Sequence, residues 1–337
     1  MNTTNLIRDA YREIEPKVSR VYVMPSIPAV SAQNPYLRLF YAPIEDSDII
    51  LSSTSRLSPI ILFRRILGEK SIVHHHWFEC HNLFSMINLI YKLKILFVYR
   101  LFGGKLIWTV HNLQPHHQRY RRANKILRNL WSRLPNRLHV HCRAAAREAS
   151  AHLSVSPERF FVVPHPFYPV QQVEKREAKI DLAKRFPQLE NLSAPIVLMQ
   201  GYIAEYKGIK AVLEILQKHS IHLNLIIAGP VKRYEEAYAS KIKELTEDLR
   251  NAHYIEGYLE QEDLDMLFNA ADYVLLNYQN ILHSGGAILA ESYDKPIIAP
   301  RKGCLMELEN ARLFSNEEEL LKILQEITKK RESDDAA

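Results

Sequence analysis

The chain has 337 residues, of which 47% are hydrophobic and 24% are charged, so it is long enough to form two domains with separate cores. No apolar run approaches the length of about 18 residues that a membrane span needs, and the polar start of the chain, Met1 to Lys17, does not predict a signal peptide. Three widely spaced cysteines indicate neither a disulfide framework nor a zinc motif. We therefore expect a cytoplasmic protein.

Positive charge is concentrated in the first half of the chain. Residues 1–170 carry 23 Lys and Arg against 10 Asp and Glu, whereas residues 171–337 carry 21 against 28, so the two parts have net charges of +13 and −7. A basic surface of this size attracts nucleic acid, anionic lipid headgroups or a phosphorylated acceptor. Because no nucleic-acid recognition motif is present, we do not expect a nucleic-acid partner.

Apolar runs predict six strands in the first half, each separated from the next by a segment of helix length. The predicted strands are Arg20–Pro25, Asp48–Ser52, Ser71–His75, Lys105–Val110, Arg137–His141 and Arg159–Val163. Alternation of strand and helix predicts a parallel, doubly wound α/β sheet. No Gly-x-Gly-x-x-Gly follows the first strand, so the sequence does not support a dinucleotide site there.

Histidines gather at the predicted strand ends, and the first half holds 11 of the 15. A metal site is not expected, because neighbouring histidines of the run His74–His76 point to opposite faces of a strand and no His-x3-His pattern supports them. His111 follows a strand directly, where ligands of doubly wound sheets bind, and an imidazole titrates near neutral pH. His111 is therefore a candidate catalytic residue; the alternative is a histidine that satisfies a buried backbone group.

Two segments of the first half, 81–101 and 118–134, combine apolar and aromatic residues with several Lys and Arg. Basic amphipathic helices of this kind bind anionic membrane surfaces. The alternative is a solvated helix that packs its apolar stripe on the sheet. The two interpretations are compatible, since one face of a helix can pack while its basic rim meets lipid.

A proline-rich run, Val163 to Pro169, interrupts the regular pattern and marks a domain boundary, which we place between 168 and 169. The two predicted domains are 1–168 and 169–337. In the second domain the predicted strands are Pro195–Met199, His222–Ala228, His253–Glu256, Tyr273–Leu276 and, as the last, Pro296–Ala299. A helix from Glu317 to Lys330 follows.

The segment Asn277 to Glu291 reads as strand end, polar loop and helix start. Ser284 is a good N-cap, and Gly285 and Gly286 leave bare amide N–H groups at the positive end of the helix dipole, which suits a phosphate. Glu291 returns to the same helix face about two turns later, where its carboxylate can accept both ribose hydroxyls. The alternative is an ordinary helix start followed by a surface Glu.

This segment resembles the Glu-x7-Glu element of the retaining nucleotide-sugar glycosyltransferases of family 4, which have the GT-B fold. His283 stands at the position of the first Glu and Glu291 at that of the second. In the family the second Glu holds the ribose, the intervening amides hold the diphosphate, and the first Glu contacts the transferred sugar. The resemblance therefore implies a nucleotide site, and it assigns His283 to the sugar while leaving the type of sugar open.

A second loop, from Gly201 to Gly208, resembles the phosphate-binding loop of the same family. Lys207 matches the family's Lys, whereas Tyr202 replaces an Arg. Either Lys207 and the helix dipole suffice for the diphosphate, or another basic side chain substitutes for the missing Arg.

Three further positions follow the order of the family's loops. Gly229 ends a predicted strand, and Gly257 with Tyr258 resembles the loop that cradles the nucleotide base through its main chain. The strand that ends at His111 brings, in the family, a histidine beside the donor sugar. The resemblance thus covers most of the chain.

The resemblance implies two Rossmann-like doubly wound domains that face a cleft, with the acceptor in the first domain, the nucleotide in the second and the final helix packed back on the first. It implies a hexosyltransferase-type enzyme that moves a sugar from a UDP- or GDP-linked donor to a glycan or polyprenyl-diphosphate-linked acceptor in surface polysaccharide biosynthesis. No metal or other cofactor is expected, because Lys207 and the Ser284 helix can stabilise the departing diphosphate. With the basic first half, we expect a peripheral protein on the inner face of the cell membrane.

Two other interpretations remain at this point. The replacements at Tyr202 and His283 are compatible with a non-catalytic GT-B subunit that supports a partner transferase. A nucleotide-sugar epimerase shares the architecture and needs no acceptor. If the enzyme retains configuration, the leaving phosphate takes the acceptor proton; if it inverts, His111 is the first candidate base.

Overall fold

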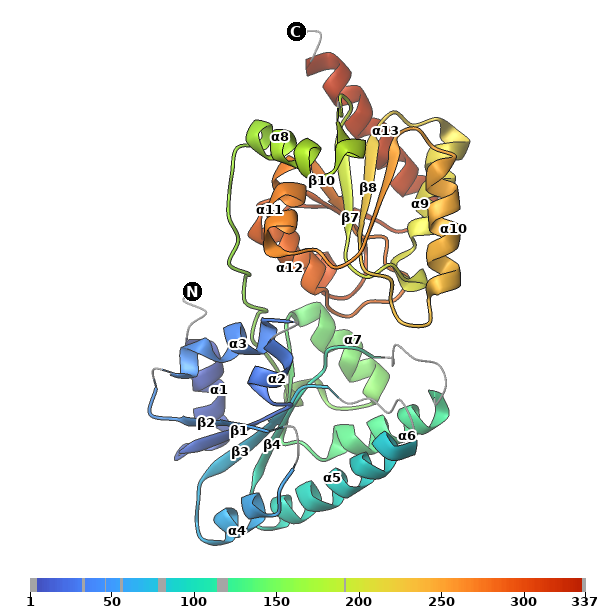
Figure 1. Cartoon of the computed structure of the whole chain (residues 1–337). Coiled ribbons are helices and arrows are strands. Elements are labelled where there is room, and N and C mark those ends of the chain that lie inside the picture. Colours follow the sequence, from blue (N-terminus) through green and yellow to red (C-terminus); the bar gives the residue numbers. More distant parts are fainter. Residues whose placement is uncertain are drawn as a thin grey trace. The chain divides into compact units, whose positions relative to one another are not determined.

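The chain forms two α/β units, Met1–Pro166 and Phe167–Ala337, each built on one parallel sheet (Figure 1). The computed structural model describes residues 5–31, 34–45, 47–54, 57–77, 83–113, 121–190 and 192–334. The side chains of 83–84, 121–123 and 330–334 are not part of that description. Among the described helices, none combines the length and apolar character that crossing a membrane requires.

The sheet of the first unit has six parallel strands in the order β2-β1-β3-β4-β5-β6, and each overlaps a strand predicted from the sequence. The chain passes from β1 to β2 and then crosses back to β3, so the direction of winding reverses between β1 and β3. The strands are β1 Arg20–Met24, β2 Ile50–Ser53, β3 Ser71–His75, β4 Lys105–Thr109, β5 Arg137–Val140 and β6 Phe160–Val162.

Helices cover both faces of this sheet, and β3 shows how its residues divide between them. His74 faces Tyr11 of α1 and Tyr41 of α3, whereas His75 packs on Trp131 of α6. Buried apolar residues of α1, α3, β1 and β4 form one core cluster on the first of these faces. The helices are α1 Leu6–Ile14, α2 Ile27–Ser31, α3 Tyr36–Glu45, α4 Ile60–Ile66, α5 Leu83–Leu101, α6 Arg121–Arg133 and α7 Arg143–Leu153.

The sheet of the second unit has the order β12-β11-β10-β7-β8-β9, again all parallel. This is the strand order of a doubly wound Rossmann sheet, in which the direction of winding reverses between the first and fourth strands, here β7 and β10. The strands are β7 Ile196–Gln200, β8 Asn224–Gly229, β9 Ala252–Glu256, β10 Tyr273–Leu275, β11 Ile297–Pro300 and β12 Ala311–Phe314.

One feature of the second unit differs from the sequence prediction. The run Pro296–Ala299 is not the last strand, because β12 pairs with β11 at the edge of the sheet; only Phe314 of β12 is buried, so the strand has no apolar run. In the last helix, α13, Leu320, Leu324 and Ile327 are buried in the second unit's core, and packing of this helix on the first domain stays a prediction. The helices are α8 Lys175–Arg185, α9 Ile209–His219, α10 Glu236–Glu247, α11 Gln261–Ala270, α12 Gly285–Ser292 and α13 Glu317–Asp334.

Candidate functional site

Most of the predicted nucleotide-binding residues follow β7 and β10, the two strands that flank the reversal point of the second sheet. The loop after β7 begins at Gly201, and the loop after β10 runs from Leu276 to the start of α12 at Gly285. Because ligands of doubly wound sheets bind beyond the carboxyl ends of the strands at such a point, these two loops are the expected ligand site. The loop after β8 lies next to them, since β8 pairs with β7.

The loops after β7 and β8 are held together by their backbones. Gly229 has φ +148°, and a Cβ atom added there would lie 2.3 Å from the carbonyl oxygen of Gly201. The amide of Ile203 donates to Pro230 O at 2.9 Å, and the amide of Lys232 donates to Ile203 O at 3.1 Å. The predicted site residues Gly201 and Gly229 therefore form one backbone layer, which only glycine at 229 permits.

Lys207 lies over this layer. Its Nζ donates to the carbonyl oxygen of Gln200 at 2.8 Å and lies 5.5 Å from the ring centroid of Tyr278. A Cβ atom on Gly201 would come within 2.4 Å of the same Nζ, so the missing side chain at 201 makes room for the ammonium group. Lys207 is thus placed at the carboxyl edge of the sheet, where the sequence predicts a phosphate.

Tyr278 connects the Lys207 loop to the start of α12, and sequence reasoning missed it. The Ser284 hydroxyl donates to the Tyr278 hydroxyl at 3.2 Å, and the Tyr278 ring stacks on Tyr206 with centroids 5.9 Å apart. The Nζ of Lys232 lies 4.9 Å from the Tyr206 ring centroid. No sequence pattern marks Tyr206, Tyr278 or Lys232; the only signal is that each stands within a loop that the resemblance singles out.

Ser284 caps α12 as predicted. Its Oγ accepts a hydrogen bond from the amide of Ala287 at 3.1 Å, and its side chain is buried. Gly285 and Gly286 form the first turn, whose amides carry the positive end of the helix dipole. Anion binding by these amides remains a prediction; Tyr278, which contacts the Ser284 cap and lies near Lys207, links this N-terminus to a cation.

The other predicted donor-site residues lie around this centre. Glu291, two turns along α12, is half-buried, and burial together with the nearby Glu309 raises the pKa of its carboxyl group. Gly257 has φ +129° with open space where a Cβ would stand, and its amide donates to Gly229 O at 3.2 Å. Tyr258 and Tyr202 are 69% and 55% exposed, so neither is packed into the loop layer.

His283 is half-buried and directly precedes the Ser284 cap. The loop that carries it is fixed by the segment after β11, because the amide of Cys304 donates to Leu282 O at 2.8 Å. Gly303, with φ +50°, lies so close that an added Cβ would be 2.4 Å from the same carbonyl oxygen. His283 therefore stands at the carboxyl edge of the second sheet, on a loop that the segment after β11 holds at Leu282.

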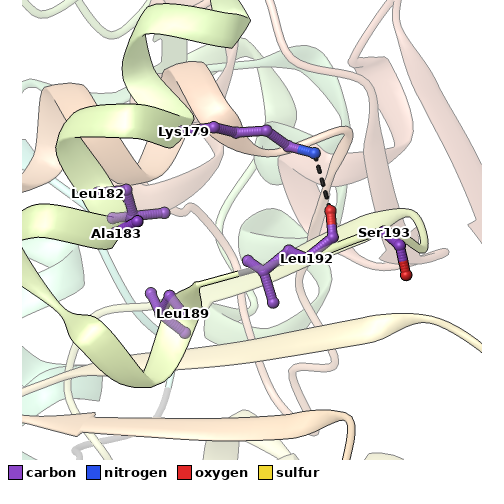
Figure 2. Close-up of a pocket in the computed structure, with 6 residues that line it drawn as sticks. All are labelled: Lys179, Leu182, Ala183, Leu189, Leu192 and Ser193. Carbon is purple, nitrogen blue, oxygen red and sulfur yellow. Dashed lines mark hydrogen bonds between the residues drawn. The ribbon is translucent and has the colours of Figure 1, made fainter.

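A cavity of about 350 Å³ lies elsewhere in the second unit, between α8 and the segment that leads into β7 (Figure 2). Lys179 at its rim donates to Leu192 O at 3.0 Å. Its lining residues precede β7, so the cavity lies at the amino edge of the sheet, away from the loops described above. They are Lys179, Leu182, Ala183, Leu189, Leu192 and Ser193.

In the first unit, His111 follows β4 and stands at the end of a cluster of histidines that lie on or directly after β3 and β5. Its Nε2 lies 3.3 Å from Nδ1 of His76, and its ring stacks on Trp77 with centroids 4.9 Å apart. Burial, with smaller contributions from His139 and His165, holds the pKa of His111 well below its usual range. At neutral pH its imidazole is therefore uncharged. Within the described residues, no three His, Cys, Asp or Glu side chains form a group that could hold a metal ion.

Comparisons with known proteins agree with this arrangement. Residues 181–331 match the family model of glycosyl transferases group 1. A GDP-mannose:glycolipid 4-beta-D-mannosyltransferase of Xanthomonas campestris pv. campestris is 25% identical over 281 residues, which cover 79% of this chain and 70% of that protein. Among solved structures, Anabaena Alr3699/HepE with UDP-glucose has a TM-score of 0.60 at 14% identity, covering 93% of this chain and 90% of its own. A glycosyltransferase from Rickettsia africae ESF-5 has a TM-score of 0.58 at 14% identity, covering 92% and 88%.

The group 1 domain and the mannosyltransferase relative support an enzyme of the hexosyltransferase type, and the solved structures show that its fold is GT-B. More specifically, its second unit is a glycosyl transferases group 1 domain. That domain contains the loops of Gly201, Gly229 and Ser284, so the family match and the reversal point of the sheet select the same part of the molecule.

The buried histidines make the first unit sensitive to acid. Burial lowers the pKa of His139 and His165 to about 4 and that of His75 to about 3, whereas the unfolded chain titrates at about 6.5. The contribution of these neutral histidines to the free energy of unfolding is therefore fully present above about pH 6.5 and is lost as the pH falls toward 4. Each such histidine contributes a slope of up to about 1.4 kcal/mol per pH unit.

Urea unfolding at pH 7 and pH 5, followed by tryptophan fluorescence, tests this, because all three tryptophans lie in the first unit. We expect a lower free energy of unfolding at pH 5. His139→Phe should reduce the difference, while His152→Gln, at an exposed position of α7, should leave it unchanged. Equal free energies at the two pH values would contradict the prediction.

Proposed function

We propose that this enzyme transfers a hexose from a UDP- or GDP-linked donor to a glycan or a polyprenyl-diphosphate-linked lipid, in the assembly of a surface polysaccharide. One observation carries the proposal: the ammonium group of Lys207 and the N-terminus of α12 meet, through Tyr278, at the reversal point of the second sheet. A diphosphate bound there faces a cation and a set of amide donors. Both stabilise the negative charge that develops as the sugar leaves.

We assign the remaining donor contacts from the resemblance to family 4. Gly257 and Tyr258 receive the base through the main chain, Glu291 holds the ribose, and His283 contacts the sugar. The exposed Tyr202 supplies no cation, so we assign the second basic contact to Lys232, whose Nζ lies against Tyr206. With two cations and a helix N-terminus available, we infer that no metal is required.

The low pKa of His111 bears on the stereochemistry. A general base works best when its pKa lies near the operating pH, and an imidazole whose pKa is far lower is a weak base. We infer that the leaving phosphate takes the acceptor proton, with attack from the front face and retention of configuration, as in family 4. His111 then acts as a neutral hydrogen-bonding group beside the sugar. In an inverting reaction, His111 would be the base.

The named relatives support the proposed donor and the proposed acceptor. The Xanthomonas relative is named for GDP-mannose and a glycolipid, which supports a GDP-linked donor and a lipid-linked acceptor here. The Anabaena structures contain UDP and UDP-glucose, which supports a nucleoside diphosphate sugar in general. The nucleotide base is therefore the first property to measure.

The first unit presents a surface suited to an anionic membrane. Helices α4, α5 and α6 connect β2 to β3, β3 to β4 and β4 to β5, all in one direction along the sheet, so right-handed connections put them on one face (Figure 1). Large apolar side chains on them are exposed, among them Phe63 at 61%, Phe97 at 56% and Leu101 at 69%. Exposed basic residues accompany them: Lys94, Lys125 and Arg133.

An exposed apolar surface with basic neighbours inserts its side chains into the interface while the charges meet lipid phosphates. We therefore place the enzyme on the cytoplasmic face of the cell membrane, where a polyprenyl-linked acceptor is presented. The apolar residues exposed on or next to these helices are Ile60, Phe63, Ile66, Leu67, Ile87, Ile90, Tyr91, Phe97, Leu101, Phe102, Ile126 and Leu130.

Nucleotide binding tests the donor site. We expect one of UDP, GDP and ADP to raise the melting temperature selectively, and its affinity to fall in Glu291→Ala. In Lys207→Ala the affinity for the diphosphate should fall between about tenfold and a hundredfold, as for a lost hydrogen bond to a charged group, with a smaller loss in Lys232→Ala. Lys210→Ala, which removes an exposed partner of Glu214, serves as the control. No stabilisation by any of the nucleotides would contradict the donor assignment.

Vesicle flotation tests the membrane surface. The wild type should float with phosphatidylglycerol vesicles and less with phosphatidylcholine, and binding should weaken as salt screens the basic residues. A double substitution, Phe63→Ser with Phe97→Ser, should release the protein. Ile180→Ser, at a position that is 51% exposed on α8 of the other unit, should not. Equal flotation of all three proteins would remove this surface from the proposal.

A further inference from the structure

A chain of buried polar side chains lies behind His111 in the first unit. It begins at the carbonyl oxygen of Val163, after β6, and passes through residues of β5, β4, β3 and α3 before it reaches His111. Its interior members are almost completely shielded from solvent. They are His139, Thr109, His74, Tyr41 and His76, with exposures of 0%, 0%, 0%, 0% and 1%.

In the first part of this chain of side chains, from Val163 to His74, the donor and the acceptor of each hydrogen bond are fixed. A carbonyl oxygen only accepts, so His139 donates to Val163 O through Nε2, at 2.9 Å. Burial keeps His139 neutral, and its Nδ1 then accepts from the Thr109 hydroxyl at 2.9 Å. Because the single hydrogen of the Thr109 hydroxyl is used in the bond to His139, the Thr109 oxygen accepts a hydrogen bond from His74 Nε2 at 2.7 Å.

In the second part of this chain of side chains, from His74 to His111, two arrangements of donors and acceptors are possible. His74 Nδ1 is now an acceptor, which faces the hydroxyl groups of Tyr11 at 2.7 Å and Tyr41 at 2.8 Å. The Tyr41 hydroxyl also lies 2.7 Å from His76 Nε2, and His76 Nδ1 lies 3.3 Å from His111 Nε2. If Tyr41 donates to His76, then His76 donates to His111. If Tyr41 accepts from His76, then His111 donates to His76.

Ring packing fixes the orientation of the imidazoles of His76 and His111. His76 stacks on His74 with centroids 4.5 Å apart and planes 23° apart. His111 lies nearly parallel to Trp77, at 12°, and meets the ring of Tyr36 edge-on, with centroids 5.2 Å apart. Because these rings cannot turn without displacing their neighbours, the geometry of the contact between His76 and His111 is set in advance of substrate binding.

We propose that His76 is a positioning residue for His111, and that the pair of Tyr41 and His76 determines which nitrogen of His111 carries the proton. A neutral imidazole offers one donor and one acceptor, so this choice decides whether His111 gives a hydrogen bond to the sugar or receives one. The link to catalysis rests on the proposed role of His111 beside the donor sugar. The link to the His111 tautomer does not depend on that role.

Substitutions at His76 separate positioning from packing. His76→Phe keeps the ring volume and removes both nitrogens, and kcat should fall between about tenfold and a hundredfold while KM for the donor changes little. His76→Asn places an amide near the position of Nδ1 and should restore much of kcat. His75 is the matched control, because it is buried on the same strand but faces Trp131 on the other side of the sheet. His75→Phe should affect stability and leave kcat nearly unchanged.

The decisive readout needs no activity. In the wild type labelled with 15N-histidine, the two ring nitrogens of His111, assigned by comparison with His111→Gln, should show one predominant neutral tautomer. In His76→Phe they should show a mixture, because the His76 nitrogen that faces Nε2 is gone. Tyr41→Phe, which removes only a hydroxyl group, should also change the tautomer ratio and serves if His76→Phe does not fold.

Identical His111 nitrogen shifts in the wild type and in both variants would overturn the inference, whatever the enzyme transfers. Loss of kcat in His75→Phe as large as in His76→Phe would also overturn it, because packing alone would then explain the effect. If the His111 nitrogen shifts change in the variants but the rate of transfer does not, His76 controls the His111 tautomer, and the proposed link of that tautomer to catalysis is refuted. Failure of the nucleotide panel with altered shifts would count against the proposed function only.

Discussion

The contact between the backbones at Gly201 and Gly229 is the constraint on which the donor site depends. A side chain at 229 would collide with the Gly201 carbonyl group, so the two loops could not lie in one layer. The same layer places the Lys207 ammonium group where a side chain at 201 would otherwise stand. Two positions without side chains thus allow the loop after β7 to lie close to β8 and leave room for the Lys207 ammonium group.

The start of α12 completes this site because Tyr278 joins it to the Lys207 loop. The Tyr278 hydroxyl meets Ser284 Oγ, which in turn caps the helix, while the ring of Tyr278 lies near Lys207 Nζ. Amide donors and the cation are therefore held by shared contacts before any ligand binds. Preorganised charge of this kind costs no rearrangement when the diphosphate leaves, which is the physical basis of the proposed chemistry.

Apolar runs were sufficient to predict the sheets, because strands buried on both faces of a parallel sheet are continuously hydrophobic. They failed at β12, an edge strand with a single buried residue, Phe314. The Ser284 cap was predictable from local chemistry. Tyr278 and Lys232 were not, since their contacts join loops that are far apart in sequence and neighbours only once the strand order is known.

The histidine chain could not be derived from the sequence for the same reason. Its strand residues come from β3, β4 and β5, and their contacts require that these three strands be adjacent and in register. The sequence did indicate that neighbours such as His74 and His75 face opposite sides of a strand, and the structure agrees. The sequence could not predict which face of the sheet carries this chain of side chains, because that depends on α1 and α3, which supply Tyr11 and Tyr41.

The most direct test of the central claim is the rate of sugar transfer to a lipid-linked acceptor in EDTA, by the wild type and by Lys207→Ala, with the linkage of the product determined by NMR. If Lys207 and the α12 N-terminus stabilise the leaving diphosphate without a metal, the wild-type rate is unaffected by EDTA, the product keeps the donor's configuration, and Lys207→Ala lowers the rate at least about a hundredfold. Transfer that stops in EDTA, or that does not respond to Lys207, would contradict the account.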